Sequence, residues 1–226
     1  MPIAKKVNKD FFKTWSPNMA YVLGFFTADG SMYQTNRGTH FIDFQITDKK
    51  LLEDIRDALD SNHKISVRKA LDKNRKPRYR LQIGSVEIFK DLSKIGLMQN
   101  KSKTVRLPKI PKRYLADFVR GYFDGDGCVH LGRYWRKDRK QWKWQFTVNF
   151  TSGSRQFLID LWGVLGQHTK GGRVGTKTGG YELVFGQHDS IALFYLMYNN
   201  ASARIFLERK YKTFQKALKI LRAGVA

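Results

Sequence analysis

The sequence has almost no cysteine: Cys128 is the only one among 226 residues. A single cysteine excludes an internal disulfide framework and a zinc site built on several thiolates. The five histidines contain no pair at the spacing that metal ligands use on one helix. We therefore expect neither a disulfide-stabilised secreted domain nor a zinc protein.

Long apolar runs are also missing. The first residues, "MPIAKKVNKDFFKTW", contain no apolar stretch of the length found in signal peptides. Nothing later approaches the roughly eighteen consecutive apolar residues that a membrane span needs. The expected protein is soluble and intracellular, in the cytoplasm of a prokaryote or inside an organelle, without a membrane partner.

Acidic residues are scarce, since 19 Asp and Glu stand against 42 Lys and Arg and leave a formal net charge of +23. This excess is larger than solubility requires, and its sign attracts phosphate. The hydrophobic content of 42% is that of a globular protein. Because ribosomal and membrane-surface proteins share such a charge, it indicates a polyanionic partner but no particular chemistry.

A repeat organises what the sequence does contain. "GFFTADG" (24–30) returns as "GYFDGDG" (121–127), and in both places an alternating strand and an amphipathic helix follow. Each half is predicted to run helix, two strands, helix, two strands, helix, which makes an α/β (α+β) fold of two pseudo-symmetric αββαββα repeats. The proline-containing segment 106–113 is the expected linker. We divide the chain into repeats at 1–108 and 109–226.

The two motifs are predicted to end buried helices. Ser16 and Pro17 form a helix start and Gly30 a stop, while Pro111 can open the second helix, which runs to Gly127. Gly24 and Ala28 are four residues apart, as are Gly121 and Gly125, and these small residues allow two backbones to approach closely. We expect the two helices to pack on each other at the centre of the molecule.

That packing brings Asp29 and Asp126 together at one end of the helix pair. Two carboxylates at helix C-termini repel each other and the helix dipoles, so a cation is expected between them. Hard oxygen ligands with open coordination positions suit Mg²⁺, which keeps waters and binds phosphate oxygens. Such a pair beside a cationic surface is equipped to hydrolyse a phosphodiester.

These residues resemble the LAGLIDADG homing endonucleases in their single-chain, two-motif form. "VLGFFTADG" (22–30) and "VRGYFDGDG" (119–127) fall into register with the nine-letter motif, although Thr27 replaces an acidic residue that is usual there. The resemblance implies saddle-shaped antiparallel sheets along the major groove of double-stranded DNA. It also implies a monomer without an obligate protein partner, and site-specific cleavage of both strands of a long asymmetric target across the minor groove, leaving 3′ overhangs.

The resemblance also implies roles for individual residues. Asp29 and Asp126 would bind the catalytic Mg²⁺, with Ala28 and Gly125 beside them, and Mn²⁺ or Ca²⁺ can occupy the same sites. A lysine near the site from each repeat is expected at Lys101 and Lys210. A polar residue after the second strand of each repeat positions water, which points to Asp48 and Ser152.

DNA contacts are expected on the polar faces of the alternating strands and in the basic hairpins. Arg78, Arg80 and Gln82 are expected to read base edges, because a strand can aim a bidentate side chain, while loop lysines such as Lys73 hold phosphates. The full predicted set is Tyr33, Arg37, Gln45, Arg68, Arg78, Arg80, Gln82, His130, Lys143, Gln145, Thr147, Asn149 and Arg173.

Other functions fit less well. "DGDG" (124–127) opens like a calcium loop, but Cys128, Val129 and Trp135 stand where a ligand, a glycine and a glutamate are needed. "GGRVGTKTGG" (171–180) lacks the Gly-Lys-Ser/Thr of a phosphate loop. An intein is disfavoured because splicing residues are absent at both ends. A nucleic-acid-binding protein on the same scaffold, either an intron RNA maturase or a DNA-binding regulator, stays open as the alternative.

Overall fold

The computed structural model describes residues 5–68 and 76–222. Its order of elements is the predicted αββαββα pattern, twice, with one further helix at the end. The first half contains α1 (Pro17–Asp29), β1 (Gly30–Gln34), β2 (His40–Ile46), α2 (Lys49–Ala58), β3 (Ile65–Arg68), β4 (Arg78–Gly84) and α3 (Val86–Ile95).

The second half repeats this order and adds the last helix. It contains α4 (Leu115–Asp126), β5 (Gly127–Arg136), β6 (Gln141–Ser152), α5 (Arg155–Leu165), β7 (Arg173–Lys177), β8 (Gly180–Phe185), α6 (Gln187–Tyr198) and α7 (Glu208–Arg222). Two short 3₁₀ helices, η1 (Lys101–Lys103) and η2 (Lys112–Tyr114), lie between the halves. The predicted boundary at 108/109 falls between them and stays a prediction.

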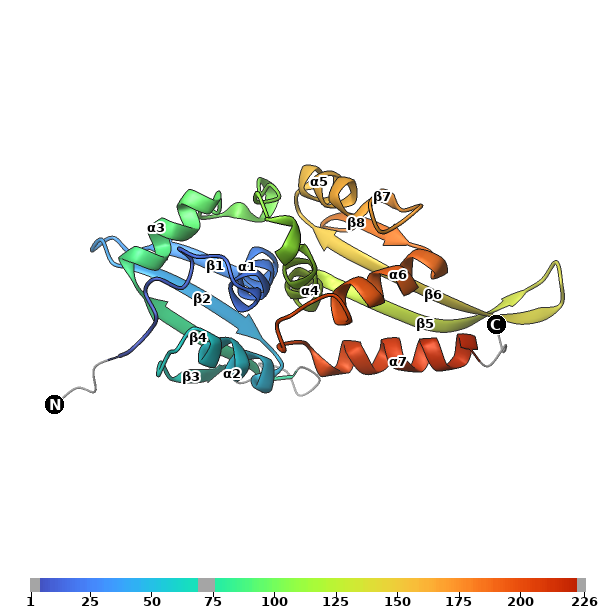
Figure 1. The fold of residues 1–226 in the computed structure, drawn as a ribbon, viewed down its shortest axis with the longest axis horizontal. Coiled ribbons are helices and arrows are strands. Elements are labelled where there is room, and N and C mark those ends of the chain that lie inside the picture. Colours follow the sequence, from blue (N-terminus) through green and yellow to red (C-terminus); the bar gives the residue numbers. More distant parts are fainter. Residues whose placement is uncertain (1–4, 69–75, 223–226) are drawn as a thin grey trace.

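Each half builds one four-stranded antiparallel sheet, in the orders β1-β2-β4-β3 and β5-β6-β8-β7. The two sheets lie end to end, with α1 and α4 side by side at the centre and the β5–β6 hairpin projecting from the far end of the second sheet (Figure 1). The predicted fold class is therefore confirmed.

Alternation of apolar and polar residues decides which face of each sheet is covered. Ile42 and Phe44 on β2, and Val148 and Phe150 on β6, are fully buried under the helices. Their neighbours on the same strands point to the opposite face, because successive side chains of a strand alternate. Each sheet thus keeps one face free of helices, and that face is polar.

Glycine brings the two motif helices into backbone contact. A Cβ at Gly24 would overlap the carbonyl oxygen of Phe118, and a Cβ at Gly121 would overlap that of Tyr21. The contact is symmetric, since each motif glycine faces the backbone of the other helix. The crossing fixes how the halves sit relative to each other and brings the two helix ends together.

Two details differ from the sequence-based expectations. The last helix begins at Glu208 and not near residue 202, so the chain before it is an irregular segment. Pro111 precedes the 3₁₀ turn η2, and α4 itself starts at Leu115. Among the described residues, no helix is both long and apolar enough to cross a membrane.

Candidate functional site

Asp29 and Asp126 are the last residues of α1 and α4, and both helices stop at a glycine, Gly30 or Gly127, in extended conformation. The absence of a side chain at Gly125 makes room for the first carboxylate. A Cβ there would lie 3.3 Å from Asp29 Oδ2 and would overlap the Cβ of Ala28. The carboxylates therefore lie at the joint between the two halves, where the sequence placed them.

The surroundings of these carboxylates disfavour their charged forms. Burial, followed by the charge of Asp29, raises the pKa of Asp126 to about 6, against the opposing pull of Lys210 and Lys101. Desolvation also raises the pKa of Asp29, although Lys210, Lys101 and Arg78 favour its charge. Two negative groups close enough to disturb each other are thus held together by the helix crossing.

The two lysines predicted near the site occupy equivalent places at the helix ends. Lys101 Nζ donates to the carbonyl of Gly30 and lies 5.5 Å from the ring centroid of Phe26. Lys210 Nζ donates to the carbonyl of Gly127 at 2.6 Å and lies 4.9 Å from the ring of Phe123. In both halves, therefore, the carbonyl oxygen of the last motif glycine accepts a hydrogen bond from a lysine.

Both ammonium groups are almost completely covered. Lys101 is 6% exposed and Lys210 is 5% exposed. Burial lowers the pKa of each to about 8, while the nearby carboxylates oppose this change. Lys210 also donates to the carbonyls of Phe123 and Asp124, at 2.5 and 2.9 Å, and so caps the C-terminus of α4.

The donor set fits a magnesium-type ion better than a metal that needs a full protein cage. The described residues contain no group of three or more His, Cys, Asp or Glu side chains that could hold a metal. Mg²⁺ is commonly held by one or two carboxylates, with waters and substrate phosphates completing its shell. Asp29 and Asp126 meet that requirement, with the backbone carbonyls of Ala28 and Gly125 as the predicted neighbours.

Asp48 and Ser152, both predicted to position water, are not equivalent. Gly30 pairs with Phe44 and Gly127 with Phe150, so Gln45 corresponds to Thr151 and Asp48 to Ser154. Asp48 is the N-cap of α2 and accepts from Leu51 N, as Ser154 accepts from Phe157 N in α5. Ser152 ends β6, and its Oγ accepts from the backbone N of Ser154.

Two polar residues close to Asp126 escaped the sequence analysis. Thr151 Oγ1 donates to the carbonyl of Asp126 at 3.0 Å. Lys177, on β7, favours the charged form of the Asp126 carboxyl and shares a small cavity with it. The alternation of β6 pointed to Thr151, but only the sheet order brings the β7–β8 hairpin back beside α4.

The predicted DNA-contacting residues of the first half share the uncovered face of its sheet. Opposite residues of an antiparallel pair point to the same face, and Gln45 pairs with Arg80, which in turn pairs with Ser66. The same rule places Arg68 opposite Arg78. Tyr33 and Gln82 lie on this face as well, while Arg37 lies in the β1–β2 turn.

Arg80 is held in place by an acidic residue that the sequence analysis overlooked. Asp43 is only 3% exposed, and its Oδ2 accepts from Nε and Nη2 of Arg80 at 2.8 and 2.7 Å. Tyr33 Oη accepts from Arg80 Nη2 at 3.3 Å and also contacts Gln82 Nε2. One edge of the guanidinium is thus engaged within the protein, and among residues 5–68 and 76–222 no hydrogen bond from Nη1 is found.

The second sheet shows the same separation of faces. His130 pairs with Thr147, Gly132 with Gln145, and Tyr134 with Lys143, so these polar side chains lie on one side. Asn149 and Arg173 join them through the pairings with Val184 on β8. Asn149 Nδ2 also lies 3.5 Å from Glu182 Oε2. Lys73, the predicted phosphate contact, lies outside the described residues.

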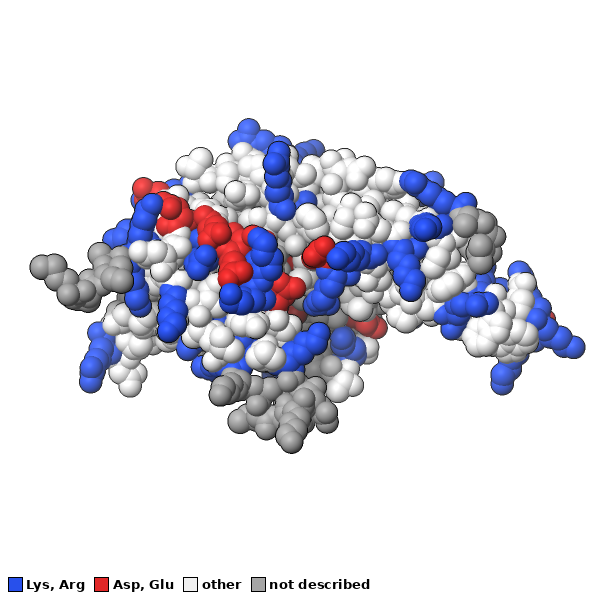
Figure 2. All heavy atoms as spheres, turned by 90° about the horizontal axis from the view of Figure 1, so that it is seen from below, with Lys and Arg blue, Asp and Glu red and all other residues white. Residues whose placement is uncertain are grey.

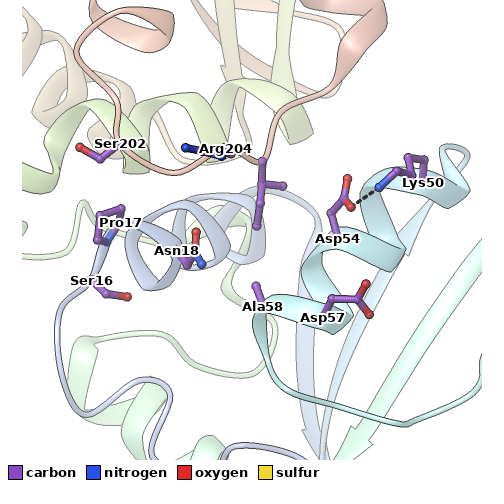
Figure 3. A pocket seen from close by; sticks show the side chains of 10 residues that line it. Ser16, Pro17, Asn18, Lys50, Asp54, Asp57, Ala58, Ser202 and Arg204 are labelled. Carbon is purple, nitrogen blue, oxygen red and sulfur yellow. Dashed lines mark hydrogen bonds and ion pairs between the residues drawn. The ribbon is translucent and has the colours of Figure 1, made fainter.

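On the face seen in Figure 2, cations are scattered along the whole length of the molecule, whereas most of the acidic residues visible there gather in one patch in the region of α2. A cavity of about 730 Å³ lies beside that helix, between it, the start of α1 and the 202–205 segment (Figure 3). It is lined by Asp54, Asp57, Asn18 and Arg204 among others, at the end of α1 away from Asp29. It is therefore separate from the carboxylate site.

Comparisons with known proteins agree with this arrangement. The chain is similar to the meganucleases I-AabMI (16% identity, TM-score 0.64, 93% of this chain and 92% of that chain) and I-LtrWI (14%, 0.64, 96% and 92%). It is also similar to I-SmaMI (13%, 0.62, 93% of both chains). At such identities these similarities establish the fold.

Two curated relatives match parts of the chain. An uncharacterized protein of Methanocaldococcus jannaschii is 28% identical over 136 residues, which are 55% of this chain and 46% of that protein. A probable translation initiation factor IF-2 of Thermococcus kodakarensis is 39% identical over 67 residues, 28% of this chain and 5% of that protein. The chain thus spans less than half the length of either relative.

The model of the LAGLIDADG-like domain family matches this sequence twice, at residues 16–96 and 113–210. Each match contains one motif helix and the sheet that follows it. The resemblance inferred from the two motifs is thereby confirmed. The chain belongs to the LAGLIDADG-like domain family.

Proposed function

We propose that this protein is a site-specific DNA endonuclease that acts as a monomer on double-stranded DNA. The observation that carries the proposal is the place of Asp29 and Asp126, at the joint where two polar, cationic sheet faces meet. Phosphate contacts on the sheets would position the duplex, and base contacts would select its sequence. Each repeat, 1–108 and 109–226, would read one half of an asymmetric target.

Asp29 and Asp126 would hold Mg²⁺, with Mn²⁺ or Ca²⁺ able to take its place, through their carboxylates and the carbonyls of Ala28 and Gly125. When bound, the ion supplies Lewis-acid stabilisation and an activated water for hydrolysis of the phosphodiester. Lys101 and Lys210 would stabilise charge on the phosphate that is cut, because each is fixed at a helix end beside the carboxylates. Thr151 and Ser152 line the Asp126 side, where they would orient water.

Work on the structural neighbours supports this assignment. I-SmaMI was solved with cleaved DNA, with uncleaved target in the presence of calcium ions, and as single and double variants in which lysines are replaced by alanine. In the present chain, Lys101 and Lys210 form such a pair of lysines beside the carboxylates.

Selection from a randomised duplex library tests the proposal. Wild-type protein in Mg²⁺ should enrich cleaved molecules that share one long asymmetric sequence with 3′ overhangs. The Asp29→Asn/Asp126→Asn double variant, which keeps side-chain size, serves as the matched control and should enrich bound but uncut molecules of the same sequence. Enrichment of bound, uncut DNA by the wild type would instead favour a binding protein, and RNA selected in place of duplex DNA would favour a maturase.

A further inference from the structure

The two hairpins that follow the motif helices have different lengths. β1 and β2 are joined by five residue pairs, from Gly30–Phe44 to Gln34–His40. β5 and β6 are joined by ten, from Gly127–Phe150 to Arg136–Gln141. Because Gly30 and Gly127 end equivalent helices, both hairpins start from the same place, and the second reaches farther from the carboxylates.

The additional length amounts to about 17 Å, at roughly 3.3 Å per residue. Figure 1 shows this part of β5 and β6 projecting beyond the helices at the end of the second half. Its exposed cations appear there in Figure 2, and the 137–140 turn adds three more, Lys137, Arg139 and Lys140. A two-stranded ribbon of this kind fits the major groove of DNA.

The two faces of the projecting part have different compositions. Pairing places Tyr134 opposite Lys143 and Arg136 opposite Gln141, so these four side chains continue the polar face of the sheet. Arg136 is also ion-paired with Asp138 in the turn. The projecting part therefore presents the same kinds of groups that line the rest of the polar face, but beyond the reach of the first hairpin.

The opposite face supports the ribbon where no helix covers it. Trp135 and Trp142 pack edge to face with ring centroids 5.7 Å apart. The Arg133 guanidinium lies 5.5 Å from the Trp142 ring centroid and 5.6 Å from that of Trp144. Cross-strand aromatic pairs and cation–π contacts of this kind stiffen a hairpin, so the ribbon can keep its direction without a core behind it.

We propose that the β5–β6 ribbon beyond Leu131 is an extra DNA-reading arm, so that the protein needs a longer half-site on the side of its second repeat. The arm would contact about three to five additional base pairs, given the extra length and a rise of about 3.4 Å per base pair. Tyr134, Arg136, Gln141 and Lys143 would make these contacts. This inference rests on the proposed function, because it assumes that the duplex lies on the polar faces.

Trimming the selected target tests the arm. Duplexes are shortened one base pair at a time from either end, and binding and cleavage are measured for each. The shortest duplex that is bound with full affinity, and is still cleaved, should extend three to five base pairs farther from the cut on one side. Two sides of equal length would overturn the inference while leaving the endonuclease intact. Absence of any binding or cleavage would instead overturn the proposed function.

Variants identify the side that the arm reads. Arg136→Ala should raise Kd by about fivefold or more on the full duplex, as loss of a good base or phosphate contact does. On the duplex trimmed on the longer side it should have no further effect, because its contacts are already gone. Lys219→Ala, an exposed cation on α7, is the charge-matched control and should leave both values unchanged. An Arg136→Ala effect that persists on the trimmed duplex would contradict the arm.

Discussion

The two halves of the molecule are alike at the C-terminal ends of the motif helices α1 and α4. They differ along the buried faces of these helices. Both ends have an aspartate, a glycine stop, and a lysine lying over a phenylalanine ring. In the middle, α1 presents Ala20, Leu23 and Thr27. The equivalent positions of α4 are Asp117, Arg120 and Asp124, which are buried and charged.

These charged residues fasten the irregular segment that leads into α7. Asp117 accepts from Ala203 N at 2.7 Å, and Arg120 donates to the carbonyl of Ala203 and, at 2.9 Å, to that of Met197 near the end of α6. Asp124 accepts from Leu207 N at 2.8 Å. The first half needs no such network, because its lysine follows α3 by a short connection. The two helix ends are thus alike where the proposed chemistry needs them to be, while each half positions its lysine there by a different connection.

The largest expected effect tests the similarity of the two ends. Asp29→Asn and Asp126→Asn each remove a charge that a hard divalent ion needs, so double-strand cleavage should fall by about 10²–10⁴-fold. Binding of DNA should persist, because a negative charge facing phosphate has been removed. Gel analysis of each labelled strand in Mg²⁺ measures this. Near-normal cutting of both strands by both variants would refute the site.

The helix crossing should be equally sensitive in both halves. Gly24→Ala and Gly121→Ala each drive a methyl group into a backbone carbonyl of the other helix, which should cost about 3 kcal/mol or more of unfolding free energy. Gly163→Ala in α5 meets no atom within 4 Å and is the matched control. It should stabilise by about 0.5–1 kcal/mol.

Urea unfolding of the three variants checks this comparison. A small effect at Gly24 with a large one at Gly121 would contradict the symmetric helix crossing. Destabilisation by Gly163→Ala would show that alanine itself, and not the crossing, is responsible.

The difference between the buried faces of α1 and α4 predicts that substitutions at equivalent positions cost different amounts of unfolding free energy. Asp124→Ala should cost about 1–3 kcal/mol, because it removes the acceptor of Leu207 N and of Tyr21 Oη, the latter at 2.7 Å, and leaves both buried donors without that partner. Thr27→Val, at the equivalent position, loses only a bond to the carbonyl of Leu23 and should cost less than about 1 kcal/mol. Thermal unfolding measures both. Equal losses would remove the distinction drawn between the halves.

The smallest expected effect is on the pH dependence of stability, which should differ between the carboxylate site and ordinary surface charges. The folded-state pKa of Asp126, about 6, lies above its unfolded value, so the folded protein binds the extra proton and gains stability as pH falls from about 6 to 4. Asp126→Asn should therefore stabilise the free protein by about 1–2 kcal/mol at pH 7, allowing for solvent screening, and by little at pH 4.

Asp138→Asn provides the control for this profile. The ion pair with Arg136 lowers the pKa of Asp138, so this variant should gain no stability at pH 7. Chemical denaturation at both pH values gives the comparison. A gain for Asp126→Asn at pH 4 as large as at pH 7 would assign the effect to something other than charge.

Most of the fold could be predicted because its signals are local and appear twice. Ser16 with Pro17, the alternation along β4 and β6, and the glycines of the motifs each specify an element independently of its neighbours. The start of α7 could not be predicted, because Ala203 and Leu207 are held by side chains of α4 far away in the sequence. Their apolar spacing alone is also compatible with a helix.

The places of Asp29 and Asp126 could be predicted, because each follows from one motif and its glycine stop. The rest of the site was less predictable where tertiary pairing decides. The segments 45–48 ("QITD") and 149–152 ("NFTS") look similar in sequence. The strand register, however, makes Gln45 the equivalent of Thr151, and Asp48 is a helix N-cap. Asp43 was overlooked, because only the sheet shows Arg80 covering it from the next strand.

The crossing at Gly24 and Gly121 also bears on how such a chain can evolve. Because backbone meets backbone there, the crossing depends on Gly24 and Gly121 themselves and not on the sequences of the hairpins that follow. Two halves that no longer resemble each other in their hairpins can then remain joined in one geometry. A duplicated gene could in this way acquire separate reading preferences in its two copies without ever passing through an unpaired intermediate.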